Sequence, residues 1–172
     1  MTKTYKAIFT GLLAQLFLGG TVFAAGISVD PSYVRVADLE LKDTTRVQKE
    51  SGFLLKINNR EATPAVFTVS VLACKEMNIK PNGGYEDFPD VKWFVFRSTE
   101  IAVPAGGTGV LPYLELKAPK DKKYLNKRWQ ALLKVAQQGK DFLGAEAVLP
   151  LWLETKTEKK PAKTSGDKKH GN

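Results

Sequence analysis

Apolar and polar residues alternate along much of the chain, most clearly in the stretch 52–74. Two runs there place apolar side chains at every second position, namely Phe53, Leu55 and Ile57, then Phe67, Val69 and Val71. A polar connector that ends in Thr63-Pro64 separates the runs. A period of two is typical of strands with one buried face, and the connector is typical of a turn. The stretch therefore predicts a β-hairpin or a pair of neighbouring core strands.

Short apolar segments predict further strands elsewhere in the chain. They are 27–41, 93–96, 101–103, 110–116 and 145–153. Pro31 suits an edge strand that kinks or changes sheets, and Pro150 favours an edge position for the last strand. Residues 75–91 lack the alternation and are rich in proline and glycine, which predicts a long loop. About seven short strands separated by turns predict an all-β fold of the β-sandwich type.

The stretch 124–137 fits two kinds of secondary structure. Its composition is rich in helix formers, and Gly139 would stop a helix. The apolar residues also alternate as they would on one side of a strand, at positions Trp129, Ala131, Leu133 and Val135. The residues alone leave both structures open.

The two ends of the chain differ from the part between them. Residues 1–24 combine Lys3 and Lys6 with an apolar run and small residues before a cleavage point after Ala24, which predicts a secretory signal peptide. The alternative is an uncleaved membrane anchor. Residues 25–155 have the length of a single domain. Residues 156–172 are dominated by lysine, proline, serine and glycine, so we expect a disordered basic tail.

The positive charge belongs mostly to the ends. The whole chain carries a net charge of +8, but residues 25–155 hold 18 basic and 16 acidic residues, a balance of +2. The tail holds six lysines and two acidic residues, a balance of +4. We interpret the tail as a tether to an anionic envelope surface or as a solubilising end. A second basic cluster, 117–128, could bind an acidic partner or be a solvated loop, and export makes nucleic acid an unsuitable partner.

Few residues could supply catalytic or metal chemistry. The only histidine, His170, lies in the tail, so the domain has no base for a Ser-His-Asp or Cys-His site. The only cysteine, Cys74, is expected to be an apolar residue at a strand end, with pairing between chains as the alternative. Glu86, Asp87 and Asp90 gather in the predicted loop and would form either a calcium site or a solvated turn. We expect no enzyme activity, no cofactor and no metal site.

The order of these segments resembles the first, immunoglobulin-like domain of the PapD-like periplasmic pilus chaperones. The segments that carry the resemblance are ISVDPSYVRV, GFLLKINNRE, PAVFTVSV, IAVPAGGTGVLPYLEL, KRWQALLKV and AVLPLWLET. Together they cover residues 26–155. The resemblance implies an immunoglobulin-like sandwich in the periplasm, and it favours a strand over a helix at 124–137.

The resemblance also implies a mode of binding. Pilus chaperones pair an edge strand with an extended subunit segment and hold its terminal carboxylate with an arginine and a lysine. Those two positions fall here on Tyr33, with Arg35 two residues along, and on Pro150. Exposed apolar side chains of the first and last strands would add pockets for the partner. The predicted partner-binding residues are therefore Ile27, Val29, Tyr33, Arg35, Ala147, Leu149 and Leu151.

Two functions follow as hypotheses. The first is a chaperone-like accessory to a surface or envelope structure of pilus type, which binds a pilin-like or envelope subunit. The second is a structural component of an envelope assembly, tethered by the basic tail.

Overall fold

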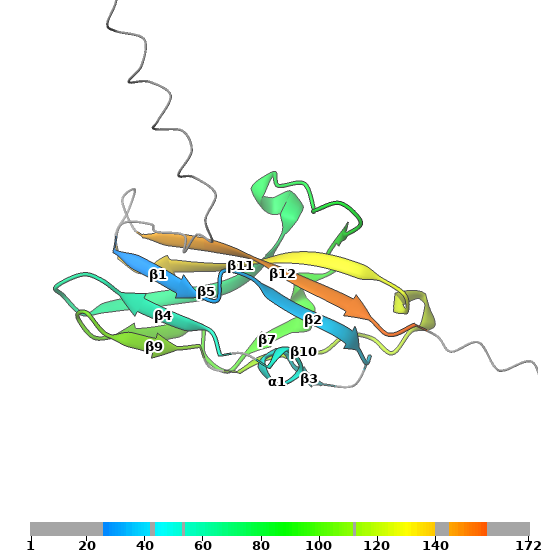
Figure 1. The fold of residues 1–172 in the computed structure, drawn as a ribbon, viewed down its shortest axis with the longest axis horizontal. Helices are drawn as coiled ribbons and strands as arrows, with labels where there is room; N and C mark the ends of the chain where they lie inside the picture. The colour runs from blue at the N-terminus through cyan, green and yellow to red at the C-terminus, as the bar shows by residue number, and fades with distance from the viewer. Residues whose placement is uncertain (1–25, 42–43, 53, 112, 140–144, 158–172) are drawn as a thin grey trace, which may run out of the picture.

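The structure is a computed structural model that describes residues 26–41, 44–52, 54–111, 113–139 and 145–157 (Figure 1). The predicted signal peptide and nearly all of the predicted tail lie outside these residues. None of the helices formed by the described residues is long and apolar enough to cross a membrane.

One layer of the molecule is a sheet built around two long strands. Its strand order is β2 (Val34–Leu39), β12 (Glu146–Thr155), β11 (Arg128–Gln137), β5 (Ala65–Ala73) and β8 (Glu100–Val103), and the short β6 (Glu86–Asp87) also pairs with β11. β11 is antiparallel to both β12 and β5, whereas β2 runs parallel to β12. Residues 128–137 of the stretch that fitted both a helix and a strand thus form a central strand, which the resemblance favoured, whereas Tyr124 lies in a short helical turn.

The other layer consists of two small sheets placed end to end (Figure 1). The first has the order β1 (Ile27–Asp30), β4 (Lys56–Asn59) and β9 (Thr108–Val110), and the second has the order β3 (Thr45–Arg46), β10 (Leu114–Leu116) and β7 (Phe94–Phe96). The helical turns are α1 (Val47–Ser51), η1 (Cys74–Met77), η2 (Val91–Trp93) and η3 (Lys122–Tyr124). Buried side chains of both layers, such as Phe67, Leu133 and Ile57, meet in one core. The predicted all-β sandwich is confirmed.

The first strand changes sheets, as Pro31 predicted. β1 pairs with β4 in one layer, the Asp30–Pro31 peptide bond is cis, and β2 then pairs with β12 in the other layer. Figure 1 shows β1 and β2, in blue, following one another across the molecule.

The predicted hairpin in the stretch 52–74 is wrong. β4 pairs with β1 and β9, whereas β5 pairs with β11 and β8, so the two strands lie in opposite layers. The connector 60–64 carries the chain from one layer to the other. Both strands still turn their alternate apolar residues to the shared core, which is why the pattern alone resembled a hairpin.

Candidate partner-binding surface

β12 has a stretch of open edge. On one side it pairs with β11 from Glu146 to Glu154, but on the other side β2 pairs with it only from Leu151 onward. Among the described residues, no strand pairs with residues 146–150 on the β2 side. We call residues 146–150 the open edge. An unpaired strand edge is a template for a strand from another chain.

Pro150 marks the end of the open edge. It lies directly before Leu151, where pairing with β2 begins. Proline has no backbone N–H to donate to a neighbouring strand, so its place beside the unpaired stretch agrees with its chemistry. The predicted edge position therefore holds only for residues 146–150. From Leu151 onward β12 lies between β11 and β2.

The side chains along the open edge alternate between core and surface. Ala147 and Leu149 are buried, whereas Val148 and Pro150 are half-buried on the outer face of the sheet. Glu146 is exposed on the same outer face and forms an ion pair with Lys134 of β11, with an Nζ–Oε2 distance of 2.6 Å. The open edge therefore offers backbone groups and a small apolar outer strip.

Five of the seven predicted binding residues do not present exposed apolar side chains, and that part of the prediction is wrong. They are Ile27, Val29, Ala147, Leu149 and Leu151, each at most 3% exposed. β1 and β12 lie against each other, and these side chains face inward between the layers. The physical reason is the period of two, because a strand that covers a core must turn its apolar set toward it.

The other two predicted residues, Tyr33 and Arg35, are accessible. The Tyr33 side chain is 51% exposed just before β2, and its ring centroid lies 5.3 Å from that of Trp152. Tyr85 stacks against Trp152 with centroids 5.9 Å apart, and the Arg128 guanidinium lies 4.4 Å from the centroid of the Tyr85 ring. We call Tyr33, Trp152 and Tyr85 the aromatic stack. It lies on the outer face, at the end of the open edge.

Glu154 is the polar centre beside the aromatic stack. Its Oε1 accepts hydrogen bonds from Arg35 Nε and Nη2, at 3.2 and 2.9 Å, and from Tyr85 Oη at 2.5 Å. Arg128 Nη2 lies 3.6 Å away. The Tyr85 hydrogen bond, followed by those from Arg35 and the charges of both arginines, lowers the pKa of the Glu154 carboxyl. Arg35 thus already binds a carboxylate of its own chain.

Gln130 anchors the loop 75–91 on this outer face. It is 3% exposed, and its Oε1 accepts hydrogen bonds from Trp152 Nε1 at 3.1 Å and from the Asn82 backbone N–H at 2.8 Å. Its backbone carbonyl accepts from the Phe88 N–H at 3.0 Å. Sequence reasoning missed this cluster. Residues alternate between the two faces of β12, with Leu151 and Leu153 toward the core, so Trp152 and Glu154 must lie on the outer face. This alternation could have indicated the cluster from the sequence.

The three acidic residues of the loop have separate structural partners. Asp87 accepts hydrogen bonds from the backbone N–H groups of Cys74 and Lys75, Asp90 accepts from the Lys92 N–H, and Glu86 pairs with Lys127. No group of three acidic, histidine or cysteine residues in the described ranges could hold a metal ion. The sequence left a calcium site and a solvated turn open for this loop, and the hydrogen bonds and the ion pair of the three acidic residues agree with the turn.

Cys74 is fully buried at the end of β5. Its Sγ lies 3.6 Å from the carbonyl oxygen of Gln130. Burial, with the nearby Asp87 carboxylate, raises the pKa of the Cys74 thiol to about 11. The thiol is therefore sheltered and protonated at neutral pH, as expected for a packing residue.

Comparison with known proteins identifies the fold. No protein-family model and no curated protein matches the chain. The ASH/PapD-like domain 7 of human CEP192 matches at 8% identity with a TM-score of 0.50, over 90% of this chain and 99% of that one. This chain has a PapD-like immunoglobulin fold. A proposed carbohydrate binding protein from Bacteroides ovatus matches at 15% identity with a TM-score of 0.54, over 77% of this chain and 38% of that one.

The E. coli chaperone DraB also resembles this PapD-like chain, at 10% identity with a TM-score of 0.47, over 76% of this chain and 55% of DraB. The chain thus spans less than two thirds of the length of the B. ovatus protein and of DraB.

Proposed function

We propose that this chain is an exported, periplasmic, non-enzymatic assembly module that binds an extended segment of a protein partner by strand addition. The observation that carries the proposal is the open edge, residues 146–150 of β12. The partner is a pilin-like or envelope subunit, and the chain acts as its chaperone-like accessory during assembly of a surface structure. The signal-peptide pattern of residues 1–24 and the PapD-like fold support this assignment.

A partner strand along the open edge would be short. Five residues of a strand extend about 16 Å at about 3.3 Å per residue. A partner strand of that length would lie in line with β2 and would end near Tyr33, where β2 begins. Its backbone groups would pair with those backbone groups of residues 146–150 that point away from β11, which provides affinity without strict dependence on partner sequence.

Side chains near the open edge would provide the selectivity. The partner's outward side chains would lie next to Val148, Pro150 and the exposed ring of Tyr33, which favour apolar or aromatic residues. Capture of a terminal carboxylate by Arg35 is not part of the proposal, because Glu154 already binds that guanidinium. In this proposal the partner is held by the backbone of the open edge, and not by the exposed apolar pockets that were expected from the sequence.

Site-specific photocrosslinking tests this proposal. We would place a photoreactive phenylalanine analogue at Val148, or at Val110 as the control, in the full chain expressed in its native cells. Val110 is also a valine on a strand and is 47% exposed, but it belongs to β9 in the opposite layer. We expect an adduct with a protein partner from position 148 and none from position 110, identified by mass spectrometry.

Charged substitutions at the same two positions complete the test. Val148→Asp should lower partner recovery at least tenfold, since a charge on an edge strand opposes pairing, whereas Val110→Asp should leave recovery unchanged. Both variants should unfold with the same midpoint as the original chain. Crosslinking from position 110 alone, or full recovery with folded Val148→Asp, would overturn the assignment of the open edge.

A further inference from the structure

Positive charge is segregated within the PapD-like chain. The segment 117–128 holds six basic residues and one acidic residue, 6 − 1 = +5, and the tail 156–172 adds +4. The remainder of the domain, 25–116 and 129–155, holds 18 − 6 = 12 basic and 16 − 1 = 15 acidic residues, a balance of −3. Two segments therefore carry all of the net positive charge that follows the predicted signal peptide.

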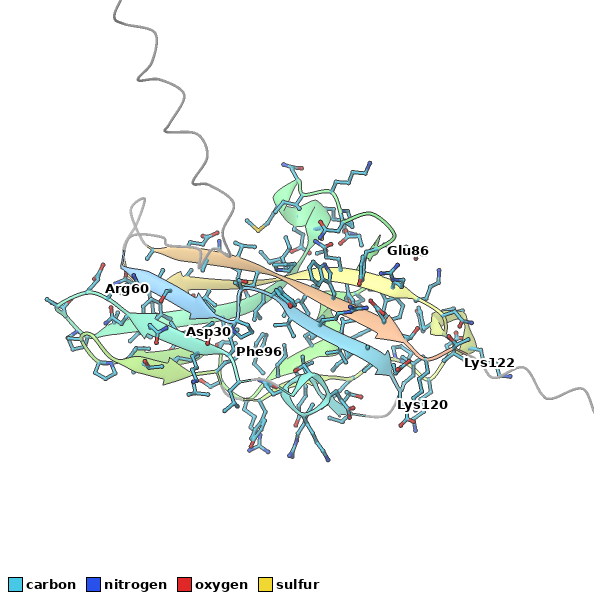
Figure 2. All side chains as sticks on the ribbon, viewed as in Figure 1. Asp30, Arg60, Glu86, Phe96, Lys120 and Lys122 are labelled. Atoms are coloured by element: carbon cyan, nitrogen blue, oxygen red, sulfur yellow. The ribbon has the colours of Figure 1, made fainter. Side chains whose placement is uncertain are left out.

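The fold brings these two segments together. The Asn126 N–H donates to the Lys156 carbonyl at 3.2 Å, and the Thr155 N–H donates to the Lys127 carbonyl at 2.9 Å. Figure 2 shows Lys120 and Lys122 at the end of the sandwich opposite Arg60. We define the basic end as Lys117, Lys120, Lys122, Lys123, Lys127 and Lys156. The five further lysines of the tail follow it directly in the sequence.

The basic end surrounds an open pocket of about 310 Å³. Half-buried Leu41 and Leu125 line it together with the exposed lysines Lys120, Lys122 and Lys156 and with the acidic residues Glu40 and Asp121. The three lysines outnumber the two carboxylates, 3 − 2 = +1, so the pocket suits an anion that carries a nonpolar part.

Three carboxylates form ion pairs with lysines of the basic end. Glu40 pairs with Lys156, Asp121 with Lys123 at 3.0 Å, and Glu86 with Lys127 at 3.0 Å. The formal charges of the six lysines and of these three carboxylates add to 6 − 3 = +3. The basic end therefore keeps a net positive charge within the folded domain.

The aromatic residues of this segment do not suit single-stranded nucleic acid. Trp129 is 2% exposed, and the Tyr124 ring packs edge-on against Trp93 and Trp129 at 5.0 and 5.8 Å. Their faces are used inside the domain, whereas nucleic-acid grooves present such rings to the bases. The charges of the basic end are lysines, which bind as mobile point charges without the planar fork of arginine.

We propose that the basic end binds the phosphate headgroups of an anionic phospholipid membrane, with the Leu41–Leu125 pocket in contact with the membrane at the level of the headgroups. This function is additional to strand addition at the open edge, and it rests on the charge of the basic end and on the lining of its pocket. Clusters of four to eight lysines are typical of peripheral binding to anionic lipid. The chain would thereby hold its partner close to the membrane surface.

Vesicle co-sedimentation tests the lipid assignment. The full exported chain is mixed with vesicles of phosphatidylcholine alone, or of three parts phosphatidylcholine to one part phosphatidylglycerol. We expect binding to the anionic vesicles at least about tenfold stronger than to the neutral ones, weakening as salt rises. Equal binding to both vesicles, or stronger binding to a single-stranded oligonucleotide than to the anionic vesicles, would overturn the proposal.

Matched variants locate the binding site. Lys120→Glu/Lys122→Glu should reduce binding to the anionic vesicles at least about tenfold, and Lys120→Gln/Lys122→Gln should reduce it less. The control, Lys56→Glu/Lys80→Glu, makes the same change in charge at two exposed lysines outside the basic end and should change binding less than about twofold.

Truncation after Thr157 separates the folded basic end from the tail. The truncated chain should keep its preference for anionic vesicles at reduced strength. Loss of all binding on truncation, with unchanged binding of folded Lys120→Glu/Lys122→Glu, would overturn the role of the folded pocket. Circular dichroism of each variant verifies that it is folded.

Discussion

Asn59 should be one of the most sensitive polar positions in the domain. It ends β4 and is 2% exposed. Its Nδ2 donates to the carbonyls of Thr63 at 2.8 Å and Pro104 at 3.1 Å, and its Oδ1 accepts from the Glu61 N–H at 3.0 Å. One side chain thus fixes both the connector between the layers and the turn between β8 and β9. Asn59→Ala removes these three hydrogen bonds at once, together with a longer one from Nδ2 to the Val103 carbonyl at 3.4 Å.

The expected loss of stability follows from these contacts. Each hydrogen bond contributes about 1 kcal/mol net, which gives a loss of about 3 kcal/mol, before any added cost for a group left buried without a partner. The neighbour Asn58 provides a matched control. It contacts Ser28 Oγ at 3.3 Å and Thr108 Oγ1 at 2.7 Å on the outer, half-buried side of the same strand. Asn58→Ala opens those partners to water and should cost about 0.5–1 kcal/mol.

Urea denaturation followed by tryptophan fluorescence measures the difference between the two variants. If the slopes agree, the difference in midpoint gives the difference in the free energy of unfolding. We expect Asn59→Ala to lower this free energy about three times as much as Asn58→Ala does. A cost for Asn58→Ala that equals or exceeds the cost for Asn59→Ala would refute the argument that Asn59 holds the two turns.

Two further predictions concern packing and pH. Gly109→Ala should lower the free energy of unfolding by about 1–3 kcal/mol, because the added Cβ would lie 2.7 Å from Val103 Cγ2 and 2.8 Å from Ile101 Cγ2. In the same urea titration Gly83→Ala, where a Cβ meets nothing within 4 Å, should change little. The pKa of Glu154 is lowered by the hydrogen bond from Tyr85 and then by Arg35 and Arg128. These contacts therefore stabilise the folded state above the ordinary pKa of 4.5, and the stabilisation is lost as pH falls through the folded-state pKa. Glu154→Gln, measured by urea unfolding across pH, should therefore lower the free energy of unfolding most near neutral pH. The loss should be under about 1 kcal/mol for this partly exposed group and should vanish in acid. A loss that grows in acid would contradict the role of the Glu154 contacts.

Much of the fold was predictable from the residue pattern. The alternation identified β5 and the last strand, Pro31 indicated the change of sheet, and the lack of pattern in 75–91 indicated the loop. The strand at 128–137 was not decided by its residues, because apolar side chains occur on both of its faces, so the alternation is incomplete and a helix fits as well. Here β11 lies between β12 and β5, and even Leu132 on its outer side is buried.

The candidate site was less predictable than the fold. Tyr33 and Arg35 were found on the surface as expected, but Glu154, Tyr85 and Arg128 join them from segments far away in the sequence. Their contact depends on how β2 aligns with β12 and on where the loop settles over β11. Such register is determined by long-range pairing, which leaves no short-range pattern.

By itself, the sequence of this PapD-like chain determined which side chains face a core, because a strand's period of two separates its apolar and polar sides whatever its neighbours are. Only the tertiary structure decided which strands become neighbours, and hence that residues 146–150 keep an open edge and that the basic loop meets the end of β12. The physical reason is that strand pairing joins backbone groups, which are the same in every residue. The choice of partner strand therefore depends on packing between distant segments and not on the local pattern.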